Sequence, residues 1–279
     1  MRTIAHLSDL HFGAHDPVIV EALIATIAQV APDVVVVSGD LTQRARPAQF
    51  RAANAFLQRI EARNCPVVLV PGNHDIPLYD VARRFLSPLR RWRRHVANGR
   101  RECCFDGDVA IVGLNTARSL TFKDGRLSLG QITGLTQSFA RASPQAMRIL
   151  VTHHPLVPLK GDARERPQSG VGRASLALTA IRAARVRILL AGHMHHAGVE
   201  HGPPDIARPS TDPRILVVQA GTATSWRRRG APNSFNLLHI DPAGALAVER
   251  MEFDGAAFVP GPTCTYSDSP SDGGWRANA

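Results

Sequence analysis

Residues 33–42 read DVVVVSGDLT and residues 66–75 read PVVLVPGNHD, and these two stretches decide the fold class. Each begins with a short apolar run rich in β-branched residues and ends in a glycine followed by polar side chains. Uninterrupted apolar runs of this length are typical of strands buried on both faces, as in a parallel sheet. The glycines allow a sharp turn directly after each strand. Both stretches therefore predict central strands whose carboxyl ends carry polar loops.

Similar runs recur along the chain, and helical patterns lie between them. The predicted strands are 2–7, 33–38, 66–70, 109–114, 147–152, 186–191 and 215–220. Apolar residues recur at helical spacing after Pro17, after Pro47 and through residues 129–142. Residues 233–240 and 244–252 predict a hairpin. The alternation of strands and helices predicts an α/β fold.

The composition of the 279 residues is that of a globular protein with a strong positive charge. Hydrophobic residues make up 44% and charged residues 20% of the chain, which excludes a disordered protein. The formal net charge of +10 favours anionic partners such as phosphates, nucleotides, nucleic acid or acidic lipid headgroups. Richness in arginine can equally reflect genome composition, so the charge alone leaves the partner open.

The chain shows no signal for export or membrane insertion. Met1-Arg2 leads directly into the strand-like TIAHLSDLH, without the apolar region of a secretory signal. No apolar run approaches the ~18 residues of a membrane span. The four cysteines predict neither a disulfide framework nor a zinc site of the CxxC type; they are Cys65, Cys103, Cys104 and Cys264. We therefore expect a cytoplasmic protein.

Two segments depart from the strand and helix pattern. Residues 76–101 carry eight arginines interleaved with apolar side chains such as Phe85 and Trp92. They are expected to form a solvated amphipathic helix that docks on the body; the alternatives are a basic lid that recruits a phosphorylated or lipid-headgroup substrate and a contact with a membrane surface. Residues 254–279 are rich in Gly, Pro, Ser and Asp, and they predict a flexible C-terminal tail after a domain of residues 1–253.

Polar clusters follow five of the predicted strands, and four of these clusters contain histidine. They are Asp9-Leu10-His11, Gly39-Asp40, Gly72-Asn73-His74-Asp75, His153-His154 and Gly192-His193-Met194-His195. In extended backbone, residues i and i+2 point to the same side, so Asp9 and His11, like His193 and His195, can converge. Ligands collect at the carboxyl ends of strands in open α/β sheets. The five clusters therefore predict one site at this edge.

The residue types in these clusters indicate metal binding. The candidate ligands are Asp9, His11, Asp40, Asn73, His153, His193 and His195. Carboxylate, imidazole and amide groups without cysteine suit divalent Mn, Fe, Co or Zn. Seven ligands exceed what one ion of four- to six-fold coordination accepts, so two divalent ions are expected. His153 is preferred to His154 because it follows the strand directly.

Five blocks of sequence, in this order, resemble the signature of the calcineurin-like metallophosphoesterase superfamily: DLHFG, SGDLT, PGNHD, THHP and AGHMHH. The resemblance spans about residues 3–196. The later GTATS…RGAPNSFN stretch is similar to bacterial members near the class III cyclic-nucleotide phosphodiesterase branch. The resemblance implies a four-layer αββα sandwich of two mixed β-sheets flanked by helices.

The resemblance also implies a role for each site residue. One ion would be bound by Asp9, His11, Asp40 and His195, and the other by Asp40, Asn73, His153 and His193. Asp40 would bridge the two ions. His74 matches the family's catalytic histidine, and Asp75 matches the acid that orients it. Asn73 could in addition donate a hydrogen bond to a phosphoryl oxygen.

The expected activity is hydrolysis of a small phosphodiester or nucleotide, with 3′,5′-cyclic nucleotides as candidate substrates. A metal-bridging hydroxide would attack phosphorus, and His74 would protonate the leaving oxygen. A pyrophosphate hydrolase acting on a lipid-linked nucleotide at a membrane surface is one alternative. A nuclease is another, although 5% aromatic residues leave little for base stacking. A non-catalytic scaffold would be expected to lose ligands, and the oligomeric state is left open.

Overall fold

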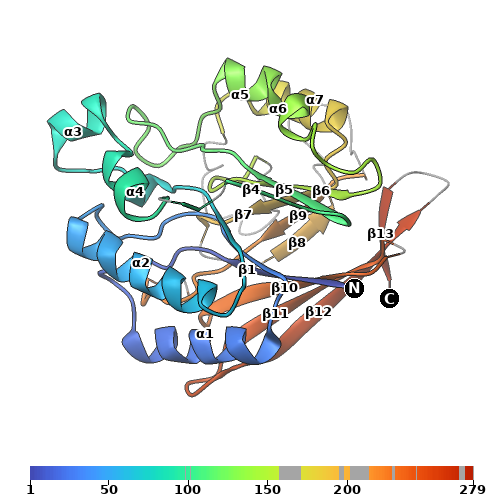
Figure 1. Cartoon of the computed structure of the whole chain (residues 1–279), viewed down its shortest axis with the longest axis horizontal. Helices are drawn as coiled ribbons and strands as arrows, with labels where there is room; N and C mark the ends of the chain where they lie inside the picture. Colours follow the sequence, from blue (N-terminus) through green and yellow to red (C-terminus); the bar gives the residue numbers. More distant parts are fainter. Residues whose placement is uncertain are drawn as a thin grey trace.

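The structure is a computed structural model that describes residues 1–97, 99–100, 102–156, 171–194, 198–201, 214–227, 230–242, 244–269 and 274–278. Two β-sheets lie face to face at its centre, and helices cover the outer face of each sheet (Figure 1). The helices are α1 (Pro17–Val30), α2 (Pro47–Glu61), α3 (Val81–Leu86), α4 (Arg90–His95), α5 (Leu129–Thr133), α6 (Leu135–Ser138) and α7 (Ala174–Ala183). A short 3₁₀ helix spans Asn73–Asp75.

Both sheets are mixed. In spatial order, the described strands of the first sheet are β13 (Gly274–Asn278), β12 (Phe258–Ser269), β11 (Leu246–Phe253), β10 (Ser234–Ile240), β1 (Arg2–Leu7), β2 (Val34–Val37) and β3 (Val67–Leu69). Those of the second sheet are β4 (Cys103–Asp106), β5 (Val109–Gly113), β6 (Met147–Val151), β7 (Ile188–Ala191), β9 (Leu216–Gln219) and β8 (Gly198–His201). Neighbouring strands are parallel in the groups β1–β2–β3 and β5–β6–β7–β9, so the carboxyl ends of these strands meet at one edge of the molecule.

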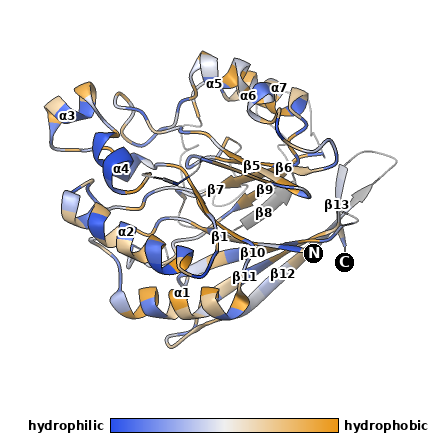
Figure 2. Ribbon diagram, viewed as in Figure 1, coloured by the Kyte–Doolittle hydropathy of each residue, from blue (hydrophilic) through white to orange (hydrophobic). Residues whose placement is uncertain are grey.

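Alternating side chains of the buried strands enter different apolar layers. Val36 of β2 packs in one cluster with Ile111 and Ile149 of the second sheet. Its neighbour Val35 belongs to the cluster beneath α1, together with Leu23. A third cluster joins the second sheet to α5, α6 and α7. Figure 2 shows the hydrophobic residues concentrated on the strands and on the inner helix faces. The predicted four-layer αββα sandwich is thereby confirmed.

The predicted strands are all present, with ends that differ by one or two residues, and the predicted hairpin is formed by β10 and β11. The helices after Pro17 and Pro47 are also confirmed as α1 and α2. The helix expected over 129–142 is shorter, because it is divided at Gly134 into α5 and α6 and ends at Ser138. None of the helices in the described part of the chain is long and apolar enough to cross a membrane.

The arginine-rich segment does not form the single amphipathic helix that its sequence predicted. It forms α3 and α4, which are separated at Ser87-Pro88. Proline lacks an N–H group and disfavours helical backbone at the preceding residue, so the helix cannot continue through this point. Docking on the body is confirmed, since Trp92 and Leu89 are buried in the cluster that contains Phe50 of α2.

The C-terminal tail that the sequence predicted after residue 253 contains strands in its described part. The strands are β12, antiparallel to β11, and β13, antiparallel to β12, and together they extend the first sheet. Trp275 and Tyr266 are buried between the sheets, and Nε1 of Trp275 donates to the carbonyl oxygen of Arg187 at 3.1 Å. Glycine and proline weaken the local strand signal, and long-range packing of these two aromatic residues overrides it.

Candidate metal centre

The predicted site residues lie in loops at the carboxyl edge of the two sheets, and their backbone is unusual. Asp9, His11, Asp40 and His193 have φ of 53°, 47°, 50° and 73°. Left-handed backbone costs a non-glycine residue on the order of 1–2 kcal/mol, so surrounding contacts must hold it. The N–H of His11 donates to the carbonyl oxygen of Asp40 at 2.9 Å. The predicted convergence of Asp9 and His11 thus arises from turned loops, and the extended backbone assumed for them is wrong.

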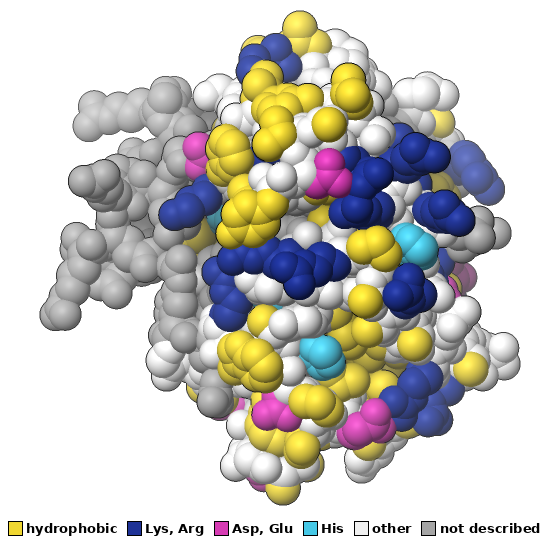
Figure 3. All heavy atoms as spheres, turned by 90° about the vertical axis from the view of Figure 1, so that its left-hand side faces the viewer, with side chains coloured by type: hydrophobic (Ala, Val, Ile, Leu, Met, Phe, Trp, Pro, Cys, Tyr) yellow, Lys and Arg dark blue, Asp and Glu magenta, His cyan; other side chains and the backbone are white. Residues whose placement is uncertain are grey.

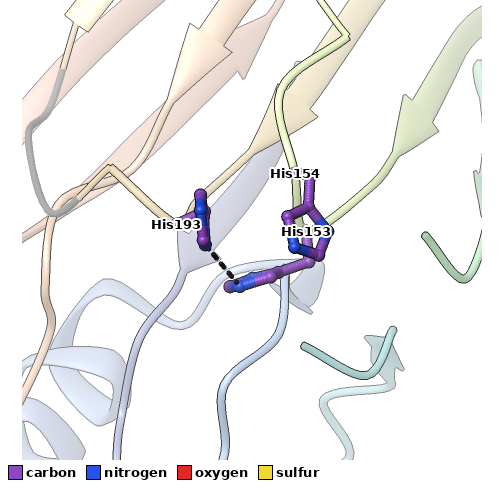
Figure 4. A group of neighbouring side chains, drawn as sticks. All are labelled: His153, His154 and His193. Carbon is purple, nitrogen blue, oxygen red and sulfur yellow. Dashed lines mark hydrogen bonds between the residues drawn. The ribbon is translucent and has the colours of Figure 1, made fainter. Parts of the chain in front are cut away.

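The side chains of these loops converge around His153. Its Nε2 lies 3.1 Å from Oδ1 of Asn73, 3.4 Å from Oδ2 of Asp40 and 3.3 Å from Nδ1 of His193. Figure 4 shows the imidazoles of His153 and His193 directed toward each other. These atoms come from four separate loops, so the tertiary fold assembles the cluster.

Asp40 also belongs to a neighbouring group of ligand-type atoms. Its Oδ2 lies 3.7 Å from Nε2 of His11, which is 3.6 Å from Oδ1 of Asp9. Groups able to hold an ion include His11 with Asp40 and His74, and Asp9 with Asp40 and His153. Asp40 therefore lies between two sets of potential ligands, as a bridging carboxylate would. His195, predicted to complete the set around Asp9, lies outside the described residues.

The donor set fits divalent metal ions. Ligand atoms about 2.1 Å from a shared ion, at angles between octahedral and tetrahedral, lie about 3.0–3.4 Å apart. The separations around His153 fall in this range. Asp9 and Asp40 are buried carboxylates, and burial of negative charge requires compensating positive charge nearby. The histidine and aspartate clusters are thus suited to hold divalent ions.

Gly72 and Gly39 allow the loops that carry Asp40 and His153 to pack closely against neighbouring backbone. A Cβ at Gly72 would lie 2.1 Å from Oδ1 and 2.4 Å from the backbone nitrogen of Asp40. A Cβ at Gly39, whose φ is 105°, would lie 2.5 Å from Nδ1 of His153. Both positions therefore exclude a side chain, which explains why glycine precedes the predicted ligands.

A hydrogen-bonded chain behind the cluster orients His153. Its Nδ1 donates to the carbonyl oxygen of Ser38 at 2.8 Å, since a carbonyl can only accept. With Nδ1 engaged in this way, Nε2 is the nitrogen that faces the cluster, and it would bind a metal ion once its proton is displaced. The Ser38 hydroxyl in turn contacts Nε2 of the buried His6 at 2.9 Å. His6 therefore supports a ligand through Ser38, as expected of a histidine outside the ligand set.

Charge coupling within the cluster shifts the pKa values of its members. Burial would raise the pKa of Asp40, but His153, His74 and His11 hold it well below its usual value. Burial lowers the pKa of His153, and the Asp40 carboxylate raises it, with a net value of about 9. Such a pair shares a proton that a divalent cation would displace, so metal binding should release protons.

His154 lies beside His153 and His193, but one of its two ring nitrogens is engaged by Thr116. Its Nδ1 lies 2.7 Å from the hydroxyl of Thr116, although its ring centroid is 4.6 Å from that of His193 (Figure 4). It could join His153 and His193 in one group of three imidazoles. The contacts of His153 with Asn73 and Asp40 nevertheless support the preference for His153 over His154.

His74 lies beside the cluster in a fixed tautomer. Its Nδ1 donates to the carbonyl oxygen of Gln43 at 2.9 Å, and its Nε2 accepts from Nη1 of Arg227 at 3.1 Å. The ring is 4.8 Å from that of His11. Burial lowers the pKa of His74; Asp40 opposes this effect, and Arg227 reinforces it. The imidazole is therefore neutral in this arrangement.

Asp75, which was predicted to orient His74, is anchored among backbone N–H groups of the neighbouring loops. Its carboxylate accepts from the N–H groups of Leu41, Thr42 and Gly72 and from the Thr42 hydroxyl, at 2.9–3.2 Å. These bonds fasten the loop after β2 to the loop after β3. Since Gln43 follows this fastened turn, Asp75 positions His74 through the backbone. The hydrogen bond from His74 to the carbonyl oxygen of Gln43 could not be predicted from the sequence, because every residue has a backbone carbonyl.

A sandwich of two sheets with a cluster of histidine and aspartate side chains at the carboxyl ends of its parallel strands is a scaffold suited to bind divalent metal ions. Residues 2–197 match the family model for the calcineurin-like phosphoesterases. The chain belongs to this family.

Similar proteins agree with this assignment. A cAMP/cGMP dual specificity phosphodiesterase of Mycobacterium tuberculosis is 29% identical over 231 residues, which cover 76% of this chain and 64% of that protein. The chain therefore spans less than two thirds of that relative. A glycerophosphodiester phosphodiesterase of Enterobacter lignolyticus is 28% identical, with coverage of 69% and 70%. The structure of PhoD superposes with a TM-score of 0.70 at 13% identity, covers 100% of this chain and 71% of that chain, and supports the fold alone.

Proposed function

We propose that this protein is a metal-dependent phosphodiesterase that hydrolyses a small phosphodiester. The observation that carries the proposal is the convergence of Asn73, Asp40 and His193 on Nε2 of His153, at 3.1–3.4 Å. Phosphoesterase chemistry follows from the family to which the chain belongs. The two relatives described above are named for diester hydrolysis, of cyclic nucleotides in one case and glycerophosphodiesters in the other. 3′,5′-Cyclic nucleotides are therefore the first substrates to test.

In this proposal, two divalent ions share Asp40. Asp9 and His11, together with His195, would hold one ion; Asn73, His153 and His193 would hold the other. When bound, the ions would activate water as the nucleophile and neutralise charge on the phosphoryl oxygens. Mn, Fe, Zn and Co all suit such ligands.

Arg227 and His74 would act on the substrate together. Among the described residues, the side chain of Arg227 contacts only neutral acceptors, Nε2 of His74 and Oε1 of Gln43. A phosphoryl oxygen is a stronger partner for a guanidinium group than either. Substrate binding would therefore draw Arg227 from Nε2, which could then take up a proton and deliver it to the leaving oxygen.

Asn73 has a second role in this scheme. Its Oδ1 faces His153, whereas its Nδ2 donates to the carbonyl oxygen of Phe122 at 3.3 Å. The amide can thus offer its oxygen to a metal ion and its N–H groups to a phosphoryl oxygen at the same time.

A substrate panel with Mn²⁺ tests the proposal. It should contain 3′,5′-cyclic AMP, bis-p-nitrophenyl phosphate, p-nitrophenyl phosphate and a nucleoside diphosphate sugar, compared by kcat/KM. We expect a diester to exceed the monoester and the pyrophosphate by about tenfold or more, which is ~1.4 kcal/mol of discrimination. Preference for the pyrophosphate or the monoester would contradict a phosphodiesterase.

Metal content tests the same proposal independently of substrate. Asp40→Ala should lose bound metal by elemental analysis together with diesterase activity, since it removes a ligand shared by both ions. Asp108→Ala is the matched control, because this carboxylate is exposed at the β4–β5 turn and, within the described residues, pairs with Arg2. An active, metal-free wild-type protein would refute a metal-dependent reaction.

A further inference from the structure

A cavity lined by arginine side chains lies outside the candidate metal centre, between α3 and α4. This cavity of about 280 Å³ is lined by Pro47, Arg83, Arg90, Arg91, Arg94 and His95. Within the described residues, Asp80 supplies the carboxylate contacts of this group, 2.6 Å from Arg83 and 3.4 Å from Arg91. Arg90 and Arg94 contact no carboxylate there. The cavity therefore carries more positive charge than its own acids neutralise, and it suits a phosphate group.

An exposed apolar surface, which we term the apolar tip, adjoins this cavity. The tip consists of Tyr79, Val81, Phe85, Leu86, Leu120 and Phe122, which make up half of the large hydrophobic side chains exposed in the described structure. Leu86 is 85% exposed and Phe122 is 58% exposed. Groups of exposed apolar side chains bordered by charged residues often mark binding sites for proteins or membranes.

Arg84 fixes the two parts of the tip to each other. It is only 3% exposed, and it donates to the carbonyl oxygens of Ser119, Pro77 and Thr121 at 2.8, 3.1 and 3.2 Å. Its guanidinium also lies 4.2 Å from the centre of the Phe122 ring. The tip is thus a built surface, in which a buried cation holds α3 against the loop that carries Leu120 and Phe122.

The tip and the arginine cavity lie on one face of the molecule. α3 and α4 follow each other at the left of Figure 1, and Figure 3 shows that side with hydrophobic side chains above and below a band of arginine or lysine. Arg91 donates to the carbonyl oxygen of Ala45 at 3.1 Å, and Arg44 covers the ring of Tyr79 at 5.4 Å. Since Gln43 contacts His74, this face borders the metal centre.

We propose that this face docks on an anionic phospholipid bilayer. Headgroup phosphates would occupy the arginine cavity, while Phe85, Leu86 and the rest of the tip enter the boundary between headgroups and acyl chains. Combined apolar burial and attraction to anionic lipid is what holds interfacial proteins on membranes. A protein partner would also cover apolar residues, but the uncompensated arginines favour a densely anionic surface. This binding requires neither bound metal nor catalysis, so it stands apart from the proposed phosphodiesterase activity.

Vesicle sedimentation of the full chain in chelator tests the proposal. Vesicles of phosphatidylcholine alone are compared with vesicles containing phosphatidylglycerol, at fixed salt. Two double variants probe the surface: Arg90→Glu with Arg94→Glu, and Phe85→Ser with Leu86→Ser. Their matched controls are Arg63→Glu with Arg185→Glu, and Leu176→Ser with Val259→Ser, which change exposed residues outside this face. Thermal melting of each variant verifies folding.

We expect binding to anionic vesicles only, reduced on the order of 30-fold or more by R90E/R94E, because each basic residue near such a surface contributes about a fivefold factor. The serine pair should also weaken binding, and both control pairs should bind like wild type. Equal loss in the charge controls would show nonspecific attraction and overturn the proposal. Binding of inorganic phosphate without binding of vesicles would also overturn the proposal, since the face would then bind a free anion. A dimer in light scattering that the serine pair dissociates would overturn it as well, since the face would then bind a second copy of the chain.

Discussion

The metal centre and the arginine-rich face with its apolar tip are neighbours in the structure but are built in opposite ways. Asp40 and His153 are buried and held by hydrogen bonds from several loops, and Asp40 has left-handed backbone. Leu86 and Phe85 are exposed and belong to a six-residue helix. Coordination depends on atoms fixed to within a fraction of an ångström, whereas attraction to a surface depends on summed charge and apolar area. Substitutions should therefore be severe in the first region and graded in the second.

The largest expected effect is at His74. His74→Ala should reduce kcat by ~10²–10⁴, as is usual for loss of a general acid, while metal content and melting temperature stay unchanged. Steady-state kinetics on the best diester, together with elemental analysis, would measure both. Unchanged kcat with full metal content would remove His74 from the reaction.

Lowering the pH should reduce the free energy of unfolding through His6, which supports the candidate ligand His153 by way of Ser38. Burial lowers the pKa of His6 to about 3, which is below its value of ~6.5 in an unfolded chain. The unfolded state then binds the extra proton, so the stability tied to neutral His6 is complete above pH 6.5 and is lost as the pH falls toward 3. Between pH 7.5 and 5 the loss should be about 2 kcal/mol.

Denaturant unfolding in chelator, at several pH values, measures this loss. His6→Gln, which can keep a bond to Ser38 but does not titrate, should lose less stability over the same interval. Parallel curves for the two proteins would mean that His6 is not responsible.

Close backbone approach can be tested at Gly72. Gly72→Ala should lower kcat/KM by about 10² or more, because its Cβ would displace Asp40 and small misplacements of catalytic groups are costly. Gly130→Ala is the matched control: a Cβ there meets nothing within 4 Å, and α5 should tolerate it. If both variants retained full activity, the tight packing around Asp40 would not matter for catalysis.

A smaller effect is expected at Arg227, on the boundary between the two regions. Arg227→Lys keeps the charge but loses the planar fork, so kcat/KM should fall by about tenfold, or ~1.4 kcal/mol. Its pH–rate profile should shift as well, since Arg227 contacts Nε2 of His74. Arg63→Lys, at an exposed position after α2, should change neither quantity.

The sequence predicted most of the residues that gather in the candidate metal centre, because the signals for them are local. Runs such as VVVV at 34–37 indicate burial on both faces, and the next glycine and aspartate indicate a turn that presents a ligand. The same reasoning failed where local signals are weak. Trp275 and Tyr266 lie among glycine, serine and proline, and only packing between the sheets makes β12 and β13 favourable.

By itself, then, the sequence determined the α/β class, the strand ends and the types of side chain that gather at them, and its resemblance to a family implied the sandwich. Only the tertiary structure decided how these groups act: His74 and Arg227 are 153 residues apart, yet their contact leaves Nε2 unprotonated. It also decided that Asp75 binds backbone, and that Pro88 divides the arginines around a cavity beside an apolar tip. Periodicity and turn residues encode burial and reversal of the chain, whereas a hydrogen bond between distant segments depends on where the whole fold places both partners.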